Sequence, residues 1–221
     1  MITLYGDASR TRANRCTWML NELGIEYENK PLAFRPGQEK PADFLALNPN
    51  GKCPTLVDGD LVLFESLAIN LYLARKYGGS GLGPRTPEED ALMAQWSFWV
   101  ATEVEKPLLL TAAVRHLFDP RLPGTEETDI TLGKLQRPWS VLDAHLQDRT
   151  FMLGDRFTVA DLNLAAVMHF IPIADVDISR WPSMQRWLEA CLSRPGAVDV
   201  RSVAFRVPRP QSSRDIFAMF V

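Results

Sequence analysis

The spacing of apolar residues changes several times over the first 47 positions of the chain. Residues 1–5 form a short apolar run of the kind found in buried strands. Residues 7–23 place apolar side chains three and four positions apart and are followed by a glycine, which predicts a helix with one buried stripe. A second strand is expected within residues 25–32 and a short helix within residues 42–47. The predicted order is therefore strand, helix, strand, helix.

A loop, two short apolar runs and another helical stripe follow within residues 48–77. Pro54 cannot donate a hydrogen bond to a strand ladder, so it is expected to end the loop before the next strand. Residues 55–57 and 61–64 are apolar and flank the pair Asp58-Gly59, which favours a type I′ hairpin between antiparallel strands. Apolar residues then recur at helical spacing until a pair of glycines ends the helix.

Beyond a stretch rich in glycine and proline, the remaining sequence has the period of a helix. We therefore expect a first domain over residues 1–78, a linker over residues 79–87 and an all-helical domain over residues 88–221. The helices expected in the last domain are one over residues 88–118 with a kink at Pro107, one between residues 125 and 147, one opened by a capping box at Thr158 and Asp161, and one after Trp181-Pro182.

Composition and charge exclude several classes of function. A net charge of -3 and a pI near 5.7 provide no strongly positive surface for a phosphate backbone, so nucleic acid is not an expected partner. The chain shows no signal-peptide pattern and no apolar stretch of the ~18 residues that a membrane span needs, so a soluble cytoplasmic protein is expected. Three cysteines without a CxxC pair and three histidines without metal-ligand spacing predict neither a disulfide framework nor a metal site.

Four motifs at fixed distances carry a family resemblance. They are TRANRCTWMLNELG from residue 11, NPNGKCP from residue 48, the pair Glu65-Ser66 eleven residues after Pro54, and FTVADL from residue 157. Together with the order of elements they resemble the cytosolic glutathione S-transferases, and the first motif is similar to a form found in many bacterial members. The resemblance covers nearly the whole chain. It implies an α/β plus all-α protein, with a thioredoxin-like first domain built on a four-stranded mixed sheet with helices, and an all-helical second domain.

The resemblance implies that the first domain binds glutathione, an anionic tripeptide with two terminal carboxylates, as co-substrate. Ser66 is expected at a helix N-terminus, where N–H groups without helical partners and the positive end of the dipole suit the γ-glutamyl carboxylate. Glu65 opposes the ammonium group of the ligand, directly or through a neighbour. An isolated Glu-Ser pair is as often a plain helix cap beside a surface acid. The spacing to Pro54 favours the binding interpretation.

The loop before the third strand is expected to hold the middle and the glycyl end of the tripeptide. In the family, the proline matched by Pro54 is cis and turns the backbone of the preceding residue toward the cysteinyl amides of the ligand. Cys53 makes these contacts by its backbone, and its thiol is interpreted either as a small apolar group or as a partner in a mixed disulfide with glutathione. Lys52 pairs with the glycyl carboxylate or is a solvated loop lysine. Gln38, Glu39 and Lys40 are vaguer candidates for the same end of the ligand.

Activation of the glutathione thiol requires a donor to its thiolate, because a thiol with a pKa of ~8.5 is mostly protonated at neutral pH. Thr11 and Ser9 stand just before the first helix, and Thr11 is the first choice because it precedes Arg15 by the family spacing. Either hydroxyl is alternatively a simple helix cap. Arg12 adds positive potential or is solvated. Cys16 is an alternative nucleophile, but its place on the apolar stripe favours a buried core position.

The resemblance places the electrophile site beside the long helix after the linker. Trp96, Trp99 and Glu103 share one face of that helix, where the aromatic rings form either a wall for an apolar electrophile or part of the core. The sequence thus predicts a glutathione transferase, expected as a homodimer. The alternatives are a glutathione-dependent disulfide reductase, dehalogenase or isomerase on the same scaffold, and a binding or assembly module without catalysis.

Overall fold

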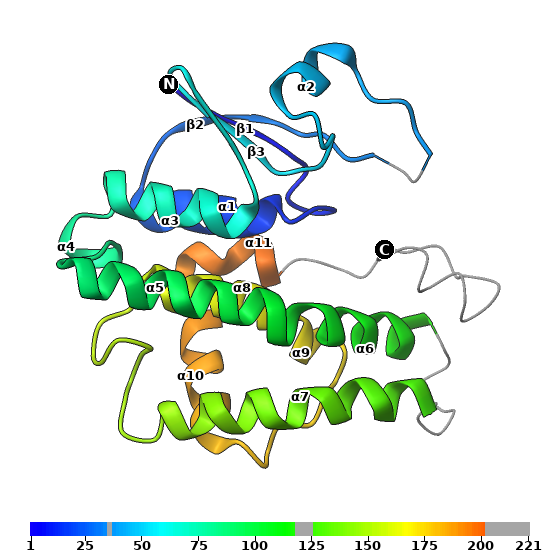
Figure 1. The fold of residues 1–221 in the computed structure, drawn as a ribbon, viewed down its shortest axis with the longest axis vertical. Coiled ribbons are helices and arrows are strands. Elements are labelled where there is room, and N and C mark those ends of the chain that lie inside the picture. Colours follow the sequence, from blue (N-terminus) through cyan, green and yellow to red (C-terminus); the bar gives the residue numbers. More distant parts are fainter. Residues whose placement is uncertain (35–36, 118–125, 202–221) are drawn as a thin grey trace. The chain divides into compact units, whose positions relative to one another are not determined.

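The computed structural model describes residues 1–34, 37–117 and 126–201 (Figure 1). The chain divides into two compact units, the first holding Met1–Ala94 together with Ser193–Val203 and the second holding Gln95–Leu192. Among the described residues, no helix is both long enough and apolar enough to cross a bilayer. The sequence-based boundaries at residues 79–87 stay a prediction, and a short helix, α4 (Gly79–Leu82), lies within that stretch.

The first unit is built on a four-stranded mixed sheet, as expected. Its strands are β1 (Ile2–Tyr5), β2 (Tyr27–Lys30), β3 (Thr55–Asp58) and β4 (Leu61–Phe64). They lie in the order β2-β1-β3-β4, with β1 parallel to β2 and antiparallel to β3, and β3 antiparallel to β4. Helices α1 (Ala13–Leu23) and α3 (Ser66–Tyr77) pack together on one side of the sheet, and α2 (Ala42–Leu47) lies on the other (Figure 1).

The turn between β3 and β4 differs from the prediction by one residue. Asp58 still pairs with Leu61, so the two turn residues are Gly59 and Asp60 instead of Asp58 and Gly59. Gly59 has a φ of 61° and Asp60 is not among the residues with positive φ, which is the pattern of a type II′ turn and not of type I′. Asp58 remains in the ladder, where it pairs with Ile2 of β1 as well as with Leu61, and its carboxylate accepts three hydrogen bonds from α3.

The long helix predicted over residues 88–118 is helical throughout its described part, but it is not one α-helix. It consists of α5 (Pro87–Trp99), a π-helical segment η1 (Val100–Glu105) and α6 (Lys106–Leu117). The wider π turns end at Glu105, two residues before Pro107, whose missing N–H and ring require a local change of helical geometry. The predicted break at residues 119–124 lies outside the described residues, as does the chain after residue 201.

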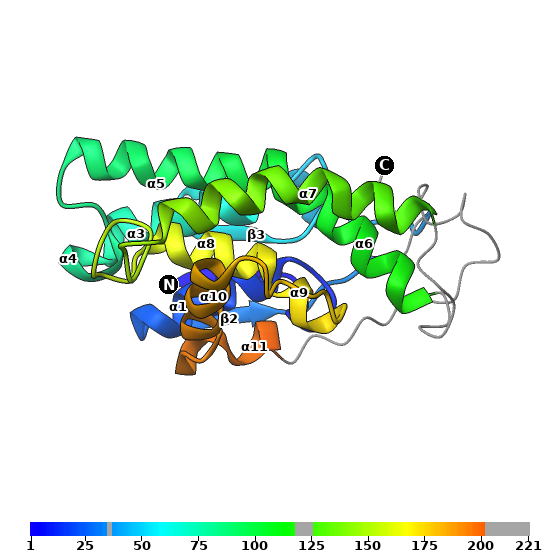
Figure 2. The same cartoon turned by 90° about the horizontal axis from the view of Figure 1, so that it is seen from below.

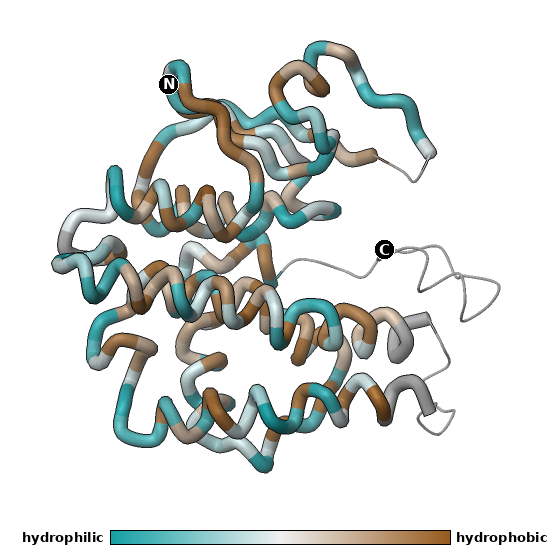
Figure 3. The backbone as a smooth tube through the Cα atoms, viewed as in Figure 1, coloured by the Kyte–Doolittle hydropathy of each residue, from teal (hydrophilic) through white to brown (hydrophobic). Residues whose placement is uncertain are grey.

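The other predicted helices of the second unit are present. They are α7 (Glu126–His145), which contains Pro138, α8 (Val159–Met168) and α10 (Pro182–Leu192). Every residue of α8 is buried, and this helix packs against η1 and α10 (Figure 1; Figure 2). Figure 3 shows hydrophobic and hydrophilic residues alternating along α5, α6 and α7, as expected for amphipathic helices. Besides α4, the described residues include short helices that were not predicted: α9 (Phe170–Ile173) in the second unit, and η2 (Pro195–Ala197) and α11 (Val198–Arg201) in the first.

The predicted capping box opens α8. The hydroxyl of Thr158 accepts a hydrogen bond from the Ala160 N–H at 3.3 Å, and the carboxylate of Asp161 accepts from the Thr158 N–H at 2.9 Å. Asp161 also accepts hydrogen bonds from the Met152 N–H and from the Trp187 indole, at 2.7 and 2.9 Å. Burial raises the pKa of this carboxyl, and the hydrogen bonds oppose that rise. The box therefore joins α8 to α10 as well as capping α8.

Candidate functional site

Ser66 is the first residue of α3, as the sequence predicted, and it is only 4% exposed. The first N–H groups of a helix have no partners within it and lie at the positive end of its dipole, so this position suits a carboxylate. Glu65 precedes the helix with an exposed side chain and a backbone φ of 71° and ψ of 108°. Residues other than glycine adopt such a conformation at a cost of roughly 1–3 kcal/mol, and it recurs at functional sites.

A buried arginine lies directly against Ser66. Arg15, on α1, is 2% exposed, and its Nη1 donates a hydrogen bond to Ser66 Oγ at 3.4 Å. The backbone of Arg15 is held in turn, because Asn70 Nδ2 donates to its carbonyl at 3.2 Å. In the sequence, Arg15 serves only to align Thr11, and no motif indicates a role for Arg15 itself. Its spacing from Met19, one turn further on the apolar stripe, already placed it on the buried side of the helix.

The loop over residues 48–54 is organised by Asn48, whose side chain is buried. Asn48 Nδ2 donates to the Lys52 carbonyl at 2.9 Å and to Thr55 Oγ1 at 3.0 Å, and the Asn48 carbonyl accepts from the Gly51 N–H at 2.8 Å. The peptide bond between Cys53 and Pro54 is cis, as the resemblance implied. Asn48 belongs to the NPNGKCP motif, but its role cannot be read from the motif because it depends on groups that only the folded loop brings together.

Cys53 is half-buried at the end of this loop. Burial raises the pKa of its thiol to about 11, with the nearby positive charge of Lys40 acting in the opposite direction. The thiol is therefore protonated at neutral pH, which agrees with its interpretation as a small apolar group. Cys16 is wholly buried, and burial raises its pKa far above the ordinary value. Its predicted place in the core is confirmed.

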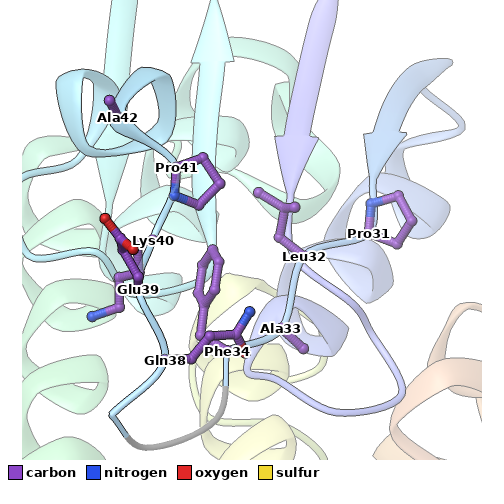
Figure 4. Close-up of a pocket in the computed structure, with 9 residues that line it drawn as sticks. All are labelled: Pro31, Leu32, Ala33, Phe34, Gln38, Glu39, Lys40, Pro41 and Ala42. Atoms are coloured by element: carbon purple, nitrogen blue, oxygen red, sulfur yellow. The ribbon is translucent and has the colours of Figure 1, made fainter.

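Gln38, Glu39 and Lys40 were the vaguer candidates for the glycyl end of the ligand. Of these, Lys40 lies against the loop over residues 48–54. A Cβ atom at Gly51 would lie 3.0 Å from Lys40 Nζ, so the ammonium group stands over the backbone of the loop, and Lys52 is exposed on the same loop. A hollow of about 530 Å³ borders Lys40, and Figure 4 shows the side chains around it. Its lining residues run from the end of β2 to the start of α2: Pro31, Leu32, Ala33, Phe34, Gln38, Glu39, Lys40, Pro41 and Ala42.

Thr11 and Cys53 border the same point in the first unit. A Cβ atom at Gly6 would lie 3.3 Å from both Thr11 Oγ1 and Cys53 Cβ, and only 2.6 Å from Ala13 Cβ. Gly6 therefore lets the chain before α1 lie close to the loop that ends at Pro54. Thr11 Oγ1 donates a hydrogen bond to the Asp7 carbonyl at 2.8 Å and accepts one from the Ala13 N–H at 3.2 Å.

Ser9 has different surroundings. It is exposed, and both its hydroxyl and its N–H donate to Asp7 Oδ1, at 2.7 and 2.9 Å. Arg12 is exposed in the residue before α1. The structure thus brings Thr11, Cys53 and the cis proline loop together, and it leaves Ser9 and Arg12 at the solvent-exposed approach to α1.

The predicted electrophile residues belong to the helical segment after the linker. Trp96 is buried, and its ring lies 4.6 Å from the His145 ring and 5.2 Å from that of Trp99, so it forms part of the core. Trp99 is half-exposed and Glu103, in the π-helical segment, is exposed. Within residues 1–34, 37–117 and 126–201, no three His, Cys, Asp or Glu side chains gather into a possible metal site. The side chain of His116 lies outside this description.

Comparison with protein families identifies the fold. The family model for the N-terminal domain of glutathione S-transferases matches residues 1–75, and the model for their C-terminal domain matches residues 92–195. The chain belongs to the glutathione S-transferase family. The resemblance seen in the four sequence motifs is thereby confirmed, as is the predicted combination of a thioredoxin-like domain and a helical domain.

Individual members of the glutathione S-transferase family align with the chain over most of its length. It is 36% identical to glutathione S-transferase 3 of Zea mays over 223 residues, which cover 96% of this chain and 98% of the relative. A theta class glutathione S-transferase from Xanthomonas axonopodis pv. citri, solved with glutathione bound, is 28% identical with a TM-score of 0.76, covering 89% of this chain and 94% of that chain. Glutathione S-transferase-I bound with lactoylglutathione is 33% identical with a TM-score of 0.75, covering 90% and 97%.

Proposed function

We propose that this glutathione transferase binds glutathione in the first unit, between the N-terminus of α3 and the loop that ends at Pro54. The γ-glutamyl carboxylate accepts hydrogen bonds from the hydroxyl and N–H of Ser66, and Glu65 pairs with the ammonium group of the ligand. The backbone of Cys53 pairs with the cysteinyl part of the tripeptide. This assignment is supported by the position of Ser66 at the start of α3 and by solved relatives that hold glutathione or lactoylglutathione.

The glycyl carboxylate of glutathione is assigned to lysine side chains. Lys40 lies over Gly51 and Lys52 is exposed on the loop over residues 48–54, so two ammonium groups are available at this loop. Arg12, exposed at the start of α1, adds positive potential for the anionic ligand. The ligand is thus bound at both acidic ends, with its cysteinyl residue beside Cys53.

The thiolate of glutathione is stabilised by Thr11. The observation that carries this choice is the shared position of Thr11 Oγ1 and Cys53 Cβ next to Gly6, because the cysteinyl part of the ligand is assigned to the backbone of Cys53. Thr11 Oγ1 already accepts the Ala13 N–H, and its own proton is donated to the neutral carbonyl of Asp7. Exchanging that carbonyl for a thiolate replaces a neutral hydrogen bond with a stronger charge-assisted one. The start of α1 adds its dipole.

Ser9 is the second candidate and has the weaker geometry. Its hydroxyl proton is already held by the carboxylate of Asp7 in a short bond of 2.7 Å. Donation to a thiolate would break a charge-assisted hydrogen bond in order to form another one. It would also bring the thiolate toward a negative charge, which disfavours its formation.

Titration of the bound thiol tests this assignment. Ultraviolet difference spectra of glutathione bound to the parent protein, Thr11→Ala and Ser9→Ala are recorded as a function of pH. The Thr11→Ala variant is expected to raise the pKa of the bound thiol by about one to two units, and Ser9→Ala is expected to leave it close to the parent value. A rise in Ser9→Ala alone would reassign activation to Ser9, and no rise in either variant would exclude both hydroxyls.

The electrophile is proposed to be apolar and to contact Trp99 and Glu103 of the second unit. Detoxification of such compounds, a cytoplasmic location and a homodimer are proposed with it on the basis of the family. Exposed Leu61 and Phe64 on the edge strand β4 provide apolar surface for a second copy. Light scattering coupled to size-exclusion chromatography tests the dimer, and a Leu61→Lys, Phe64→Lys double variant is expected to shift a dimer toward monomer.

A reductase mechanism through Cys53 has less support. Its thiol, with a pKa raised to about 11 by burial, provides little thiolate at neutral pH. Replacement of Cys53 by Val is therefore expected to preserve conjugation activity. Loss of thiol exchange on a mixed disulfide in this variant, with conjugation preserved, would establish a separate reductase activity at Cys53.

A further inference from the structure

Hydrogen bonds between buried residues join the first turn of α1 to the first two turns of α3. Arg15 Nη1 donates to Ser66 Oγ at 3.4 Å, Cys16 Sγ donates to the Ser66 carbonyl at 3.7 Å, and Asn70 Nδ2 donates to the Arg15 carbonyl at 3.2 Å. All four residues are buried. Ser66 is therefore held through both its side chain and its backbone, and Arg15 is held by the same helix that it contacts.

We propose that Arg15 is a positioning residue that orients the Ser66 hydroxyl toward the γ-glutamyl carboxylate and supplies positive charge beneath it. The inference rests on the proposed binding of that carboxylate at Ser66. Arg15 does not touch the ligand in this proposal. It acts through Ser66 and through its charge.

The orientation follows from the chemistry of a hydroxyl group. A serine hydroxyl has one proton to donate and lone pairs that accept. A guanidinium only donates, so the contact between Arg15 and Ser66 occupies a lone pair of Oγ. The hydroxyl proton must then point away from Arg15. It is left to donate to a carboxylate at the N-terminus of α3, where the N–H of Ser66 adds a second donor.

The charge of Arg15 acts over a short distance through a region of low polarity. An arginine side chain stays protonated at any pH that the protein withstands, so the charge is permanent. Its field reaches Cys16, whose pKa it lowers against the larger upward effect of burial. A charge that is 2% exposed is weakly screened by solvent and salt. The anion site at Ser66 therefore has a fixed positive charge behind it in addition to the helix dipole.

Substitutions at residue 15 separate these two contributions. Arg15→Gln keeps a hydrogen-bond donor and removes the charge, whereas Arg15→Lys keeps the charge and changes the donor geometry. Arg75→Gln is the matched control, because Arg75 is an exposed arginine of the same unit that pairs with Asp90 and lies outside the proposed site.

Calorimetric titration with two ligands tests the proposal. One is glutathione, and the other is its analogue in which hydrogen replaces the γ-glutamyl carboxylate. Arg15→Gln and Ser66→Ala are each expected to weaken glutathione binding about tenfold and to change the Kd of the analogue less than twofold. The double variant is expected to lose little more than the worse single variant, because both changes act on one interaction. Arg75→Gln is expected to match the parent for both ligands.

Several outcomes would overturn the inference. Equal weakening of both ligands in Arg15→Gln would mean a general structural role, and full additivity with Ser66→Ala would mean that Arg15 does not act through Ser66. If Arg15→Gln does not fold, the same comparison is made with Arg15→Lys, which is expected to bind glutathione at least threefold more weakly than the parent while binding the analogue normally. A parent protein that binds both ligands equally would instead contradict the proposed glutathione site itself.

Discussion

The guanidinium of Arg194 donates two hydrogen bonds to the carboxylate of Glu22, at 3.0 and 2.7 Å, and this pair fixes the end of α1 to the segment that leads into η2. The Glu22 side chain is 8% exposed and that of Arg194 is 34% exposed. The Trp18 indole donates to the same carboxylate at 3.1 Å. Glu22 is therefore a nearly buried charge whose main compensation comes from a residue 172 positions away.

Removal of Arg194 tests this compensation. Arg194→Ala is expected to lower the free energy of unfolding by about 1–2 kcal/mol, because it leaves a desolvated carboxylate without its cation. Urea denaturation measures the change. Arg75→Ala, which breaks an exposed ion pair with Asp90, is the control and should change stability by less than about 0.5 kcal/mol. Equal effects of the two substitutions would show that the burial of Glu22 does not matter.

Asp161 should be among the most sensitive positions in the second unit. Its carboxylate accepts hydrogen bonds from two backbone N–H groups, the Thr158 hydroxyl and the Trp187 indole, all of them buried. Asp161→Ala leaves these donors without an acceptor and is expected to destabilise the protein by about 3 kcal/mol or more, measured by urea denaturation. Asp161→Asn keeps one acceptor oxygen and should cost less. An Ala variant as stable as the Asn variant would contradict this account.

Asp58 should make the stability of the protein depend on pH at the acid end. Burial opposes ionisation of its carboxyl, but hydrogen bonds from Lys76, Tyr77 and Tyr72 hold its pKa at about 2, below the ordinary value of 3.8. A lowered pKa contributes stability that is fully present above about pH 4 and is lost as the pH falls toward 2. Asp58→Asn is expected to lower Tm by a few degrees at neutral pH and to reduce the loss of Tm between pH 4 and pH 2, relative to the parent.

Thermal melts from pH 7 to about pH 2 make this comparison. Asp60→Asn, which changes the exposed carboxylate of the same turn, is the matched control. If Asp58→Asn loses Tm on acidification as steeply as the parent, the network around Asp58 does not contribute the expected stability.

The backbone conformation of Glu65 indicates that this residue favours glutathione binding at the expense of protein stability. Its φ of 71° is readily adopted by glycine and not by glutamate. Glu65→Gly is therefore expected to keep Tm at or above the parent value, whereas Glu65→Ala, which cannot relieve the strain, should not raise it. Both variants should bind glutathione about tenfold more weakly, because both lose the carboxylate proposed to face its ammonium group. Calorimetry and thermal melts on the two variants separate these effects, and parent-like binding in both would remove Glu65 from the site.

Local patterns in the sequence predicted most elements of the fold. The strand runs, the helical stripes and the capping box at Thr158 depend on neighbours in the chain, and all of them are present. The turn after β3 could not be predicted to the residue, because the place of Asp58 in the ladder involves its pairing with β1 and the donors from α3, which lie elsewhere in the chain. The π-helical segment before Pro107 was also missed. Its hydrogen-bond pattern leaves no spacing signal in apolar residues.

Residues of the candidate site that belong to a sequence motif were predicted. Residues whose role depends on tertiary contacts were missed. Ser66 and Pro54 lie where the motifs indicated. Arg15 gains its significance only when α1 packs on α3, and Trp96 proves to be a core residue because His145 covers it. The contributions of Trp99 and of the other proposed ligand residues stay predictions.

The hydrogen bonds of Asn48 determine how the loop over residues 48–54 tolerates substitution. The geometry of residues 48–55 is held by one buried amide and by backbone carbonyls, and none of the hydrogen bonds described for the loop uses the side chain of Lys52 or Cys53. Those two side chains are therefore available for substitution without loss of the backbone geometry that is proposed to bind the ligand. The hydrogen bonds of a single asparagine thus separate the geometry of this loop from the identity of the side chains at positions 52 and 53.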